Sequence, residues 1–156
     1  MEFRLRERPI FKIKRTVDPR RDRKLIEFLR KHSNRINLGG ISIESGSDSK
    51  YGDNVFYAKG EKGIIGACSI VSYSRGLILC YNLSVLKEFR REGVGTALIR
   101  NVIDYASIEK IHNILVLSEI SNKEAKKFLK KIGFRKIGKI RRLFNNKDYI
   151  MWEYLP

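Results

Sequence analysis

Residues 90–99, RREGVGTALI, place two glycines between a charged turn and an apolar run. Glycine permits a close backbone approach or a positive φ angle. The apolar residues that follow, up to residue 106, recur at helical spacing. The residues that precede the segment, 77–86 (LILCYNLSVL), are apolar and branched, which is typical of a buried strand. The sequence therefore predicts a strand, a tight glycine loop and the N-terminus of a helix.

A helix N-terminus suits an anion, above all a phosphate, because its first N–H groups lack partners within the helix and its dipole is positive there. Two well-known phosphate loops are excluded by their spacing. A P-loop needs G-x-x-x-x-G-K-[ST], which is absent, and a dinucleotide fingerprint needs a small third residue where this chain has Leu98. The remaining pattern, [Arg/Gln]-x-x-Gly-x-[Gly/Ala] at residues 90–95, also fits a turn that merely requires glycine.

The composition is that of one globular domain. The chain has 156 residues, of which 42% are hydrophobic and 32% charged. No apolar run approaches the roughly 20 residues of a membrane span, and the N-terminus lacks the apolar core of a signal peptide. These observations predict a cytoplasmic protein. The absence of glutamine and the abundance of Lys, Arg and Ile resemble the usage of thermophiles.

The chain is strongly basic. It has 33 Lys and Arg against 17 Asp and Glu, a formal net charge of +16, which favours a polyanionic partner such as a nucleotide cofactor, nucleic acid, an acidic protein or an anionic membrane. Two predicted helices carry basic faces that are candidates for contact with nucleic acid or an acidic protein. A solvated helix face is the commoner explanation of such a pattern. The basic residues are Arg20, Arg21, Arg23, Lys24, Arg30, Lys31, Lys123, Lys126, Lys127, Lys130 and Lys131.

Strands and helices alternate along the chain as one α/β (α+β) unit. The sequence predicts strands at 10–15, 54–59, 63–73, 77–86, 112–120, 135–144 and 148–154, and helices at 19–32, at 94–109 and after Asn122. Residues 33–53 are rich in Gly, Ser and Asn, and a loop of this length in a compact domain is usually functional or disordered. We expect specificity to reside in this segment and in the turn at 141–149. Residues 1–9 form a basic extension or an extra strand, and residues 10–156 form the domain.

Cys68 and Cys80 lie on either side of a predicted hairpin turn at residues 74–76. Their spacing is not that of a metal site. Counting outward from Ser74 and Arg75, as the two central residues of the turn, places Cys68 opposite Cys80 or one residue out of register. Two buried thiols and a cross-strand disulfide are both compatible with this placement, and most cytosolic cysteines stay reduced.

The element order, the loop RREGVG (90–95) and the downstream stretch SNKEAKKFLKKIGF (121–134) together resemble the GNAT superfamily of acyl-CoA-dependent N-acetyltransferases. The similarity covers residues 10–156 and is greatest to the amino-terminal acetyltransferases. It implies a central mixed, mostly antiparallel sheet with helices on both faces. The second motif resembles the family's N-x-x-A-x-x-F-Y-x-K-x-G-F, with matches at Asn122, Ala125, Phe128, Lys131, Gly133 and Phe134.

The resemblance implies acetyl-CoA as co-substrate and no metal. Backbone N–H groups of the glycine loop would hold the pyrophosphate. The strand before the loop would splay at a bulge, and its backbone would pair with the pantetheine arm and polarise the thioester carbonyl near Val85. Asn122 and Phe128 of the second motif complete the expected cofactor site. The other residues of that site are Leu83, Ser84, Val85, Arg90, Arg91, Glu92, Gly93, Val94, Gly95 and Thr96.

The usual acid and base of the family are missing. Their positions correspond to Leu129 for the acid and to Leu79 and Leu117 for the base, and leucine cannot transfer a proton. Side chains two apart on a strand share a face, which makes Tyr81 and Glu119 the candidate catalytic residues. The alternative is that these two only line the acceptor groove. Tyr149 is a weaker third candidate.

The expected function is acetyl transfer from acetyl-CoA to a primary amine of a protein or peptide, by direct attack. Two alternatives stay open. One is a catalytically silent member of the family that binds CoA or nucleic acid as a regulatory module. The other is acetylation of an amine carried by RNA, which would use the net charge of +16.

Overall fold

The computed structural model describes residues 10–32, 54–73, 76–144 and 146–156. The predicted N-terminal extension, 1–9, and the predicted loop 33–53 lie outside these residues. Short 3-10 helices, η1 and η2, precede the first two α-helices. The elements in chain order are β1 (Phe11–Thr16), η1 (Pro19–Arg21), α1 (Arg23–His32), β2 (Asn54–Gly60), β3 (Gly63–Tyr73), β4 (Leu77–Val85), η2 (Lys87–Phe89), α2 (Val94–Ile108), β5 (Asn113–Glu119), α3 (Lys123–Ile132), β6 (Arg135–Phe144) and β7 (Lys147–Tyr154).

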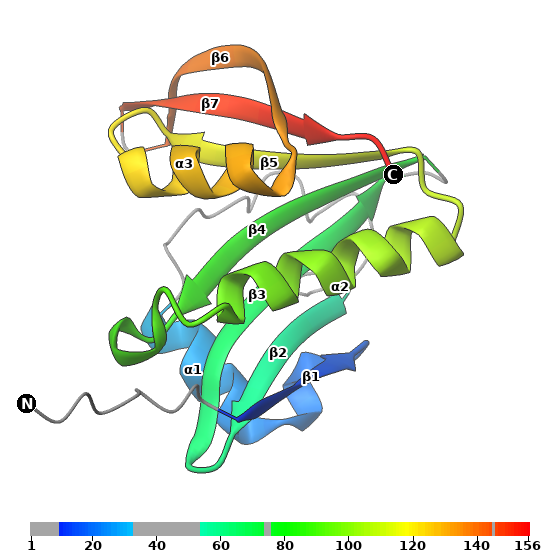
Figure 1. The fold of residues 1–156 in the computed structure, drawn as a ribbon, viewed down its shortest axis with the longest axis vertical. Coiled ribbons are helices and arrows are strands. Elements are labelled where there is room, and N and C mark those ends of the chain that lie inside the picture. The colour runs from blue at the N-terminus through cyan, green and yellow to red at the C-terminus, as the bar shows by residue number, and fades with distance from the viewer. Residues whose placement is uncertain (1–9, 33–53, 74–75, 145) are drawn as a thin grey trace, which may run out of the picture.

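The described strands form one sheet in the order β1-β2-β3-β4-β5-β7-β6. Neighbouring strands are antiparallel except β4 and β5, which are parallel and are joined by the crossover helix α2. Helices α2 and α3 lie on one face and α1 lies on the other (Figure 1). The predicted mixed, mostly antiparallel sheet with helices on both faces is confirmed. None of the helices in the described ranges is long and apolar enough to cross a bilayer.

The larger part of the core lies between the sheet and the helices α2 and α3. Trp152 of β7 is fully buried there, and its indole N–H donates to the Ser118 hydroxyl at 2.9 Å, so that the one polar atom of the ring is satisfied. On the opposite face, α1 packs Leu25 and Leu29 against Val55. Because helices cover both faces of the sheet at its centre, the residues of β3 are buried continuously from Ile65 to Val71.

Helix α1 begins later than the sequence predicts. Residues Pro19–Arg21 form η1, and the chain is extended at Asp22, with φ −106° and ψ 100°. The Asp22 carboxylate accepts a hydrogen bond from the Leu25 N–H at 3.1 Å. Asp22 therefore caps the α-helix, and the Asp18-Pro19 pair starts only the 3-10 turn.

The predicted register of Cys68 and Cys80 is wrong. Tyr73 pairs with Leu77, so the loop has three residues instead of two, and Cys80 pairs with Ile70. Even so, the two sulfur atoms lie 3.3 Å apart as free, buried thiols. They are close because side chains that are diagonal across two strands can still reach each other.

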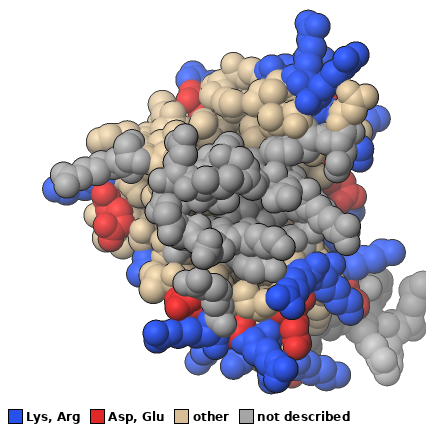
Figure 2. All heavy atoms as spheres, turned by 180° about the vertical axis from the view of Figure 1, so that it is seen from behind, with Lys and Arg blue, Asp and Glu red and all other residues tan. Residues whose placement is uncertain are grey.

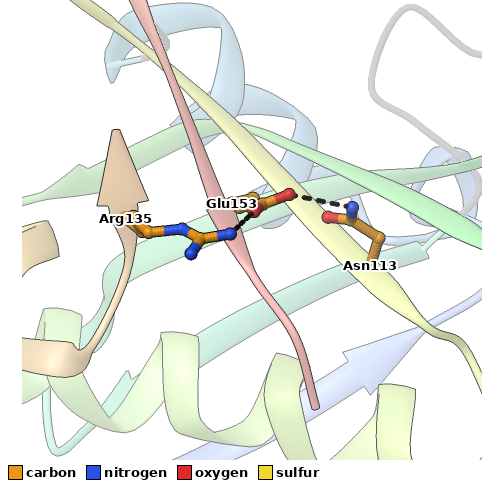
Figure 3. A network of polar contacts seen from close by, with 3 residues as sticks. All are labelled: Asn113, Arg135 and Glu153. Atoms are coloured by element: carbon orange, nitrogen blue, oxygen red, sulfur yellow. Dashed lines mark hydrogen bonds and ion pairs between the residues drawn. The ribbon is translucent and has the colours of Figure 1, made fainter. Parts of the chain in front are cut away.

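Glu153 of β7 connects that strand to both of its neighbours (Figure 3). Its carboxylate accepts hydrogen bonds from Arg135 Nη2 of β6 at 2.6 Å and from Asn113 Nδ2 of β5 at 3.2 Å. The side chain of Glu153 is only 13% exposed. The hydrogen bonds from Arg135 and Asn113 hold the pKa of Glu153 below its ordinary value.

We expect both cysteines to be reduced and protected in the folded protein. The hydrogen bond with Cys80, together with burial, raises the pKa of the Cys68 thiol and keeps it protonated. Intact-mass measurement should show slow alkylation of the native protein by iodoacetamide. In guanidinium chloride without reductant, two alkyl groups should be added. A denatured protein that takes up none would contain a disulfide.

We expect Glu153→Gln to reduce stability at neutral pH and to flatten its pH dependence. The folded-state pKa of Glu153 is lowered, so its contribution is fully present above the ordinary pKa of glutamate and is lost as the pH falls through the lowered value. Urea unfolding at neutral pH and at about pH 3 measures this difference. The control is Glu61→Gln, because Glu61 is exposed and has no ion pair among the described residues. Equal effects of the two substitutions would contradict the prediction.

Candidate active site

The two central strands pair over only part of their length. Residues Leu77–Cys80 of β4 are in register with Asn113–Val116 of β5, and the pairing ends there. Beyond this point β4 continues along β3 to Val85, while β5 continues along β7 to Glu119 (Figure 1). The strands therefore part at this end of the sheet, and each presents a strand edge to the other.

A bulge in β4 causes the parting. The register of β3 and β4 passes from Ala67–Ser84 to Ser69–Tyr81, so Asn82 and Leu83 both oppose Cys68. A bulge bends its strand and increases its twist. The residues at and after the bulge, Leu83, Ser84 and Val85, form the β4 edge that the sequence analysis expected to meet the pantetheine arm.

Several hydrogen bonds fix the free end of β4. The Ser84 hydroxyl donates to the His32 carbonyl at 2.6 Å, which ties β4 to the last residue of α1. The Arg90 Nε donates to the Val85 carbonyl at 3.1 Å. Arg90, a predicted cofactor residue, thus connects the glycine loop to the end of β4.

The glycine loop presents a helix N-terminus beside this strand edge. Gly93 is the N-cap of α2 and has a φ of 84°, a conformation that favours glycine. The first backbone hydrogen bond of the helix runs from the Ala97 N–H to the Gly93 carbonyl at 3.0 Å. The N–H groups of Val94, Gly95 and Thr96 therefore have no acceptor within the helix and remain available to an anion.

The second motif lies directly against the first. A Cβ atom at Gly95 would stand 3.4 Å from the Phe128 ring, which is van der Waals contact, so Phe128 of α3 lies against the start of α2. Asn122 caps α3 by accepting a hydrogen bond from the Ala125 N–H at 3.0 Å. Its amide nitrogen has no hydrogen-bond partner among the described residues.

The three leucines that the resemblance aligns with the family's acid and base are packed against other apolar side chains. Leu79 and Leu117 belong to a small apolar cluster with Val71 on the face opposite α2 and α3. Leu129 is 2% exposed and lies in the main core. None of these three positions can transfer a proton.

Polar groups gather instead at the end of β5. The Glu119 carboxylate accepts hydrogen bonds from the Tyr149 hydroxyl at 3.4 Å and the Ser121 hydroxyl at 3.3 Å. It also forms an ion pair with Lys147, with Nζ 3.4 Å from Oε1. Glu119 and Tyr149 are directly opposed in the β5–β7 register. Burial and the charge of Glu119 raise the pKa of Tyr149, which therefore stays protonated at neutral pH.

A pocket of about 530 Å³ lies between the end of β5 and the β6–β7 hairpin. Glu119, Ile120 and Ser121 line it from the end of β5, and residues of the β6–β7 hairpin line it from the other side. Asp148 holds that tip, because its carboxylate accepts from the Arg142 N–H at 3.0 Å and pairs with Lys139 Nζ at 3.6 Å. The lining residues are Glu119, Ile120, Ser121, Arg142, Asn146, Lys147 and Asp148.

The structure brings some of the predicted catalytic residues together. Glu119 and Tyr149 are in contact, whereas the side chain of Tyr81 lies outside the described part of the chain, although its backbone pairs with Ser69. Lys147 and Arg142 carry no local signal in the sequence that singles them out. Lys147 reaches Glu119 because β7 pairs with β5, a segment distant in the chain.

The sequence is similar to known N-acetyltransferases. The sequence profile of a family described as "Acetyltransferase (GNAT) domain" matches residues 52–136. An uncharacterised N-acetyltransferase from Chlorobaculum tepidum is 33% identical over 85 residues, which are 54% of this chain. The aligned part is 52% of that protein, so the chain spans about half the length of this curated relative.

Solved structures share the fold over nearly the whole chain. The ribosomal-protein-S18-alanine N-acetyltransferase from Escherichia coli has a TM-score of 0.71 at 14% identity, covering 92% of this chain and 94% of that one. A GNAT family acetyltransferase from Elizabethkingia anophelis, with acetyl-CoA bound, has a TM-score of 0.65 at 16% identity, covering 94% and 98%. At these identities the likeness concerns the fold.

Proposed function

The chain belongs to the GNAT acetyltransferase family, whose profile matches residues 52–136 of its 156, and on this premise we propose that it transfers an acetyl group from acetyl-CoA to a primary amine. The observation that carries the proposal is the parting of β4 and β5 beside the N-terminus of α2. One strand edge and one set of free N–H groups meet at the same end of the sheet. The acceptor that we propose is an amine of a protein or peptide.

The proposed cofactor site uses both the edge of β4 and the free N–H groups at the start of α2. Free N–H groups at the start of α2 would hold the pyrophosphate, supported by the helix dipole and by Arg91. The β4 edge, Leu83 to Val85, would pair with the pantetheine arm as an added strand does. Asn122 offers its unused amide nitrogen, and Phe128 borders the helix start. Acetyl-CoA bound to the Elizabethkingia relative supports this assignment.

The proposed chemistry is direct attack of the amine on the thioester carbonyl, without a covalent enzyme intermediate. A backbone N–H near Val85 would stabilise the developing negative charge on the carbonyl oxygen. Glu119 would take the proton of the acceptor ammonium group, because a carboxylate is already ionised at neutral pH. Tyr81 would donate a proton to the departing thiolate. Holding the two reactants in the right orientation supplies a large part of the rate.

A second candidate function is a module that binds CoA without turning it over, and the leucines at 79, 117 and 129 favour it. The basic surface is a separate feature. Figure 2 shows Lys and Arg gathered near the end that carries β6 and β7 and near the end that carries α1. Such surfaces support contact with a polyanion, which includes an acceptor carried by RNA. Release of CoA thiol in the presence of peptide amines distinguishes an enzyme from a silent module.

We expect Gly95→Val to weaken acetyl-CoA binding at least tenfold, because its side chain would crowd Phe128 and cover the free N–H groups. Isothermal titration calorimetry measures the affinity. The matched control is Gly138→Ala, since a Cβ atom at Gly138 meets nothing within 4 Å. Gly138→Ala should bind like the wild-type protein. Failure of the wild-type protein to bind acetyl-CoA would overturn the proposed function.

We expect Glu119→Gln and Tyr81→Phe each to lower kcat by about 10²-fold or more, while the affinity for acetyl-CoA stays unchanged. Each substitution removes one proton-transfer group and keeps the size of the side chain. Steady-state assays of thiol release with a peptide acceptor measure both parameters, and Glu61→Gln serves as the control. Wild-type rates in both variants would show that water carries the protons.

A further inference from the structure

We propose that the acceptor is a primary amine with a carboxylate a few bonds away, selected by the pocket between β5 and the β6–β7 hairpin. This inference rests on the proposed function, because it places the reacting amine at Glu119. Two acids, Glu119 and Asp148, line the pocket together with two cations, Arg142 and Lys147. The pairing of these four charges determines which acceptor fits.

Lys147 occupies the place that an acceptor ammonium group requires. Its Nζ lies 3.4 Å from Glu119 Oε1, which is the contact that the acceptor must make for Glu119 to take its proton. The two side chains are 58% and 33% exposed. Ion pairs this exposed are weak. An incoming ammonium group can therefore replace Lys147, whose flexible stem moves aside.

When an acceptor ammonium group replaces Lys147 at Glu119, the pocket is left with unpaired positive charge. Asp148, the other acid, already accepts from the Arg142 N–H at 3.0 Å and pairs with Lys139 at 3.6 Å. Arg142 has no side-chain ion pair within the described part of the chain. Once an amine binds Glu119, both Lys147 and Arg142 are thus cations without a carboxylate partner.

An acceptor with its own carboxylate restores the pairing of charges in the pocket. Its amine would bind Glu119, and its carboxylate would bind Lys147 or the forked guanidinium of Arg142. A neutral acceptor would leave both cations unpaired, and a second positive charge on the acceptor would be repelled. The carboxylate has two possible sources, the side chain of an acidic residue next to a peptide α-amine or the α-carboxylate of a free amino acid.

Equilibrium binding to the CoA-loaded protein tests the proposal without requiring turnover. The probes are three C-terminally amidated peptides that begin Ala-Asp, Ala-Asn or Ala-Lys and are otherwise identical, together with alanine and alaninamide. We expect the Ala-Asp peptide to bind about two- to fivefold more tightly than the Ala-Asn peptide, with the Ala-Lys peptide weakest. If the amino acid is the source, alanine binds more tightly than alaninamide. Equal binding within both sets, or no binding, overturns the inference.

Two variants that reverse one positive charge each, one inside the pocket and one outside it, test the role of the pocket. Arg142→Glu should reverse the peptide preference in favour of Ala-Lys. Lys136→Glu makes the same change of charge on β6 at an exposed lysine that does not line the pocket, and it should keep the wild-type preference. An equal effect of both variants would assign the preference to net charge and overturn the inference.

The affinity for acetyl-CoA, measured on the same samples, separates this inference from the proposed function. Loss of acetyl-CoA binding in the wild-type protein would remove both. A wild-type protein that binds acetyl-CoA and shows no charge preference among acceptors would remove only the inference.

Discussion

The bulge in β4 opposite Cys68 is the constraint on which the rest of the site depends. Two residues of β4 face one of β3, so the strand bends and its hydrogen bonds with β5 end at Cys80. β4 is still paired with β3 after the bulge, and Ser84 is tied to α1 through the His32 carbonyl. The sheet can therefore open on one side of β4 without releasing the strand. An opening of this kind would accept an extended ligand as a substitute strand.

The two sequence motifs are one structural unit. Gly93 provides the positive φ that starts α2, and Gly95 lies against the Phe128 ring of α3. Arg90 joins the loop back to the end of β4. The first motif thus supplies the free N–H groups, and the second holds the helix that presents them.

Under the proposed function, the proton-transfer groups would stand at other positions than in the resembled family. The leucines that align with the family's usual proton-transfer positions contribute to packing. Glu119 lies two residues further along the same face of β5 as Leu117, and Tyr149 and Lys147 contact its carboxylate. Proton transfer and acceptor recognition would then share one pocket at the β6–β7 hairpin. Under this proposal Lys147, which can bind the acceptor's carboxylate, also controls access to the base Glu119.

The sequence by itself determined the elements and the glycine loop. Strands and helices were predicted to within about two residues where the periodicity is strong, as in β3 and α2. The start of α1 was missed because Asp18 and Asp22 both resemble caps, and only the geometry shows which carboxylate accepts the Leu25 N–H. The register of Cys68 and Cys80 was missed because the loop has one more residue than assumed.

Tertiary structure alone decided the surroundings of Glu119. Tyr149 and Lys147 are near in space and far in sequence, and they reach Glu119 only because β7 pairs antiparallel with β5. A local pattern records which face of a strand is buried, since burial follows the alternation of side chains. It does not record which distant strand becomes the neighbour or in what register, because that choice depends on packing across the whole sheet.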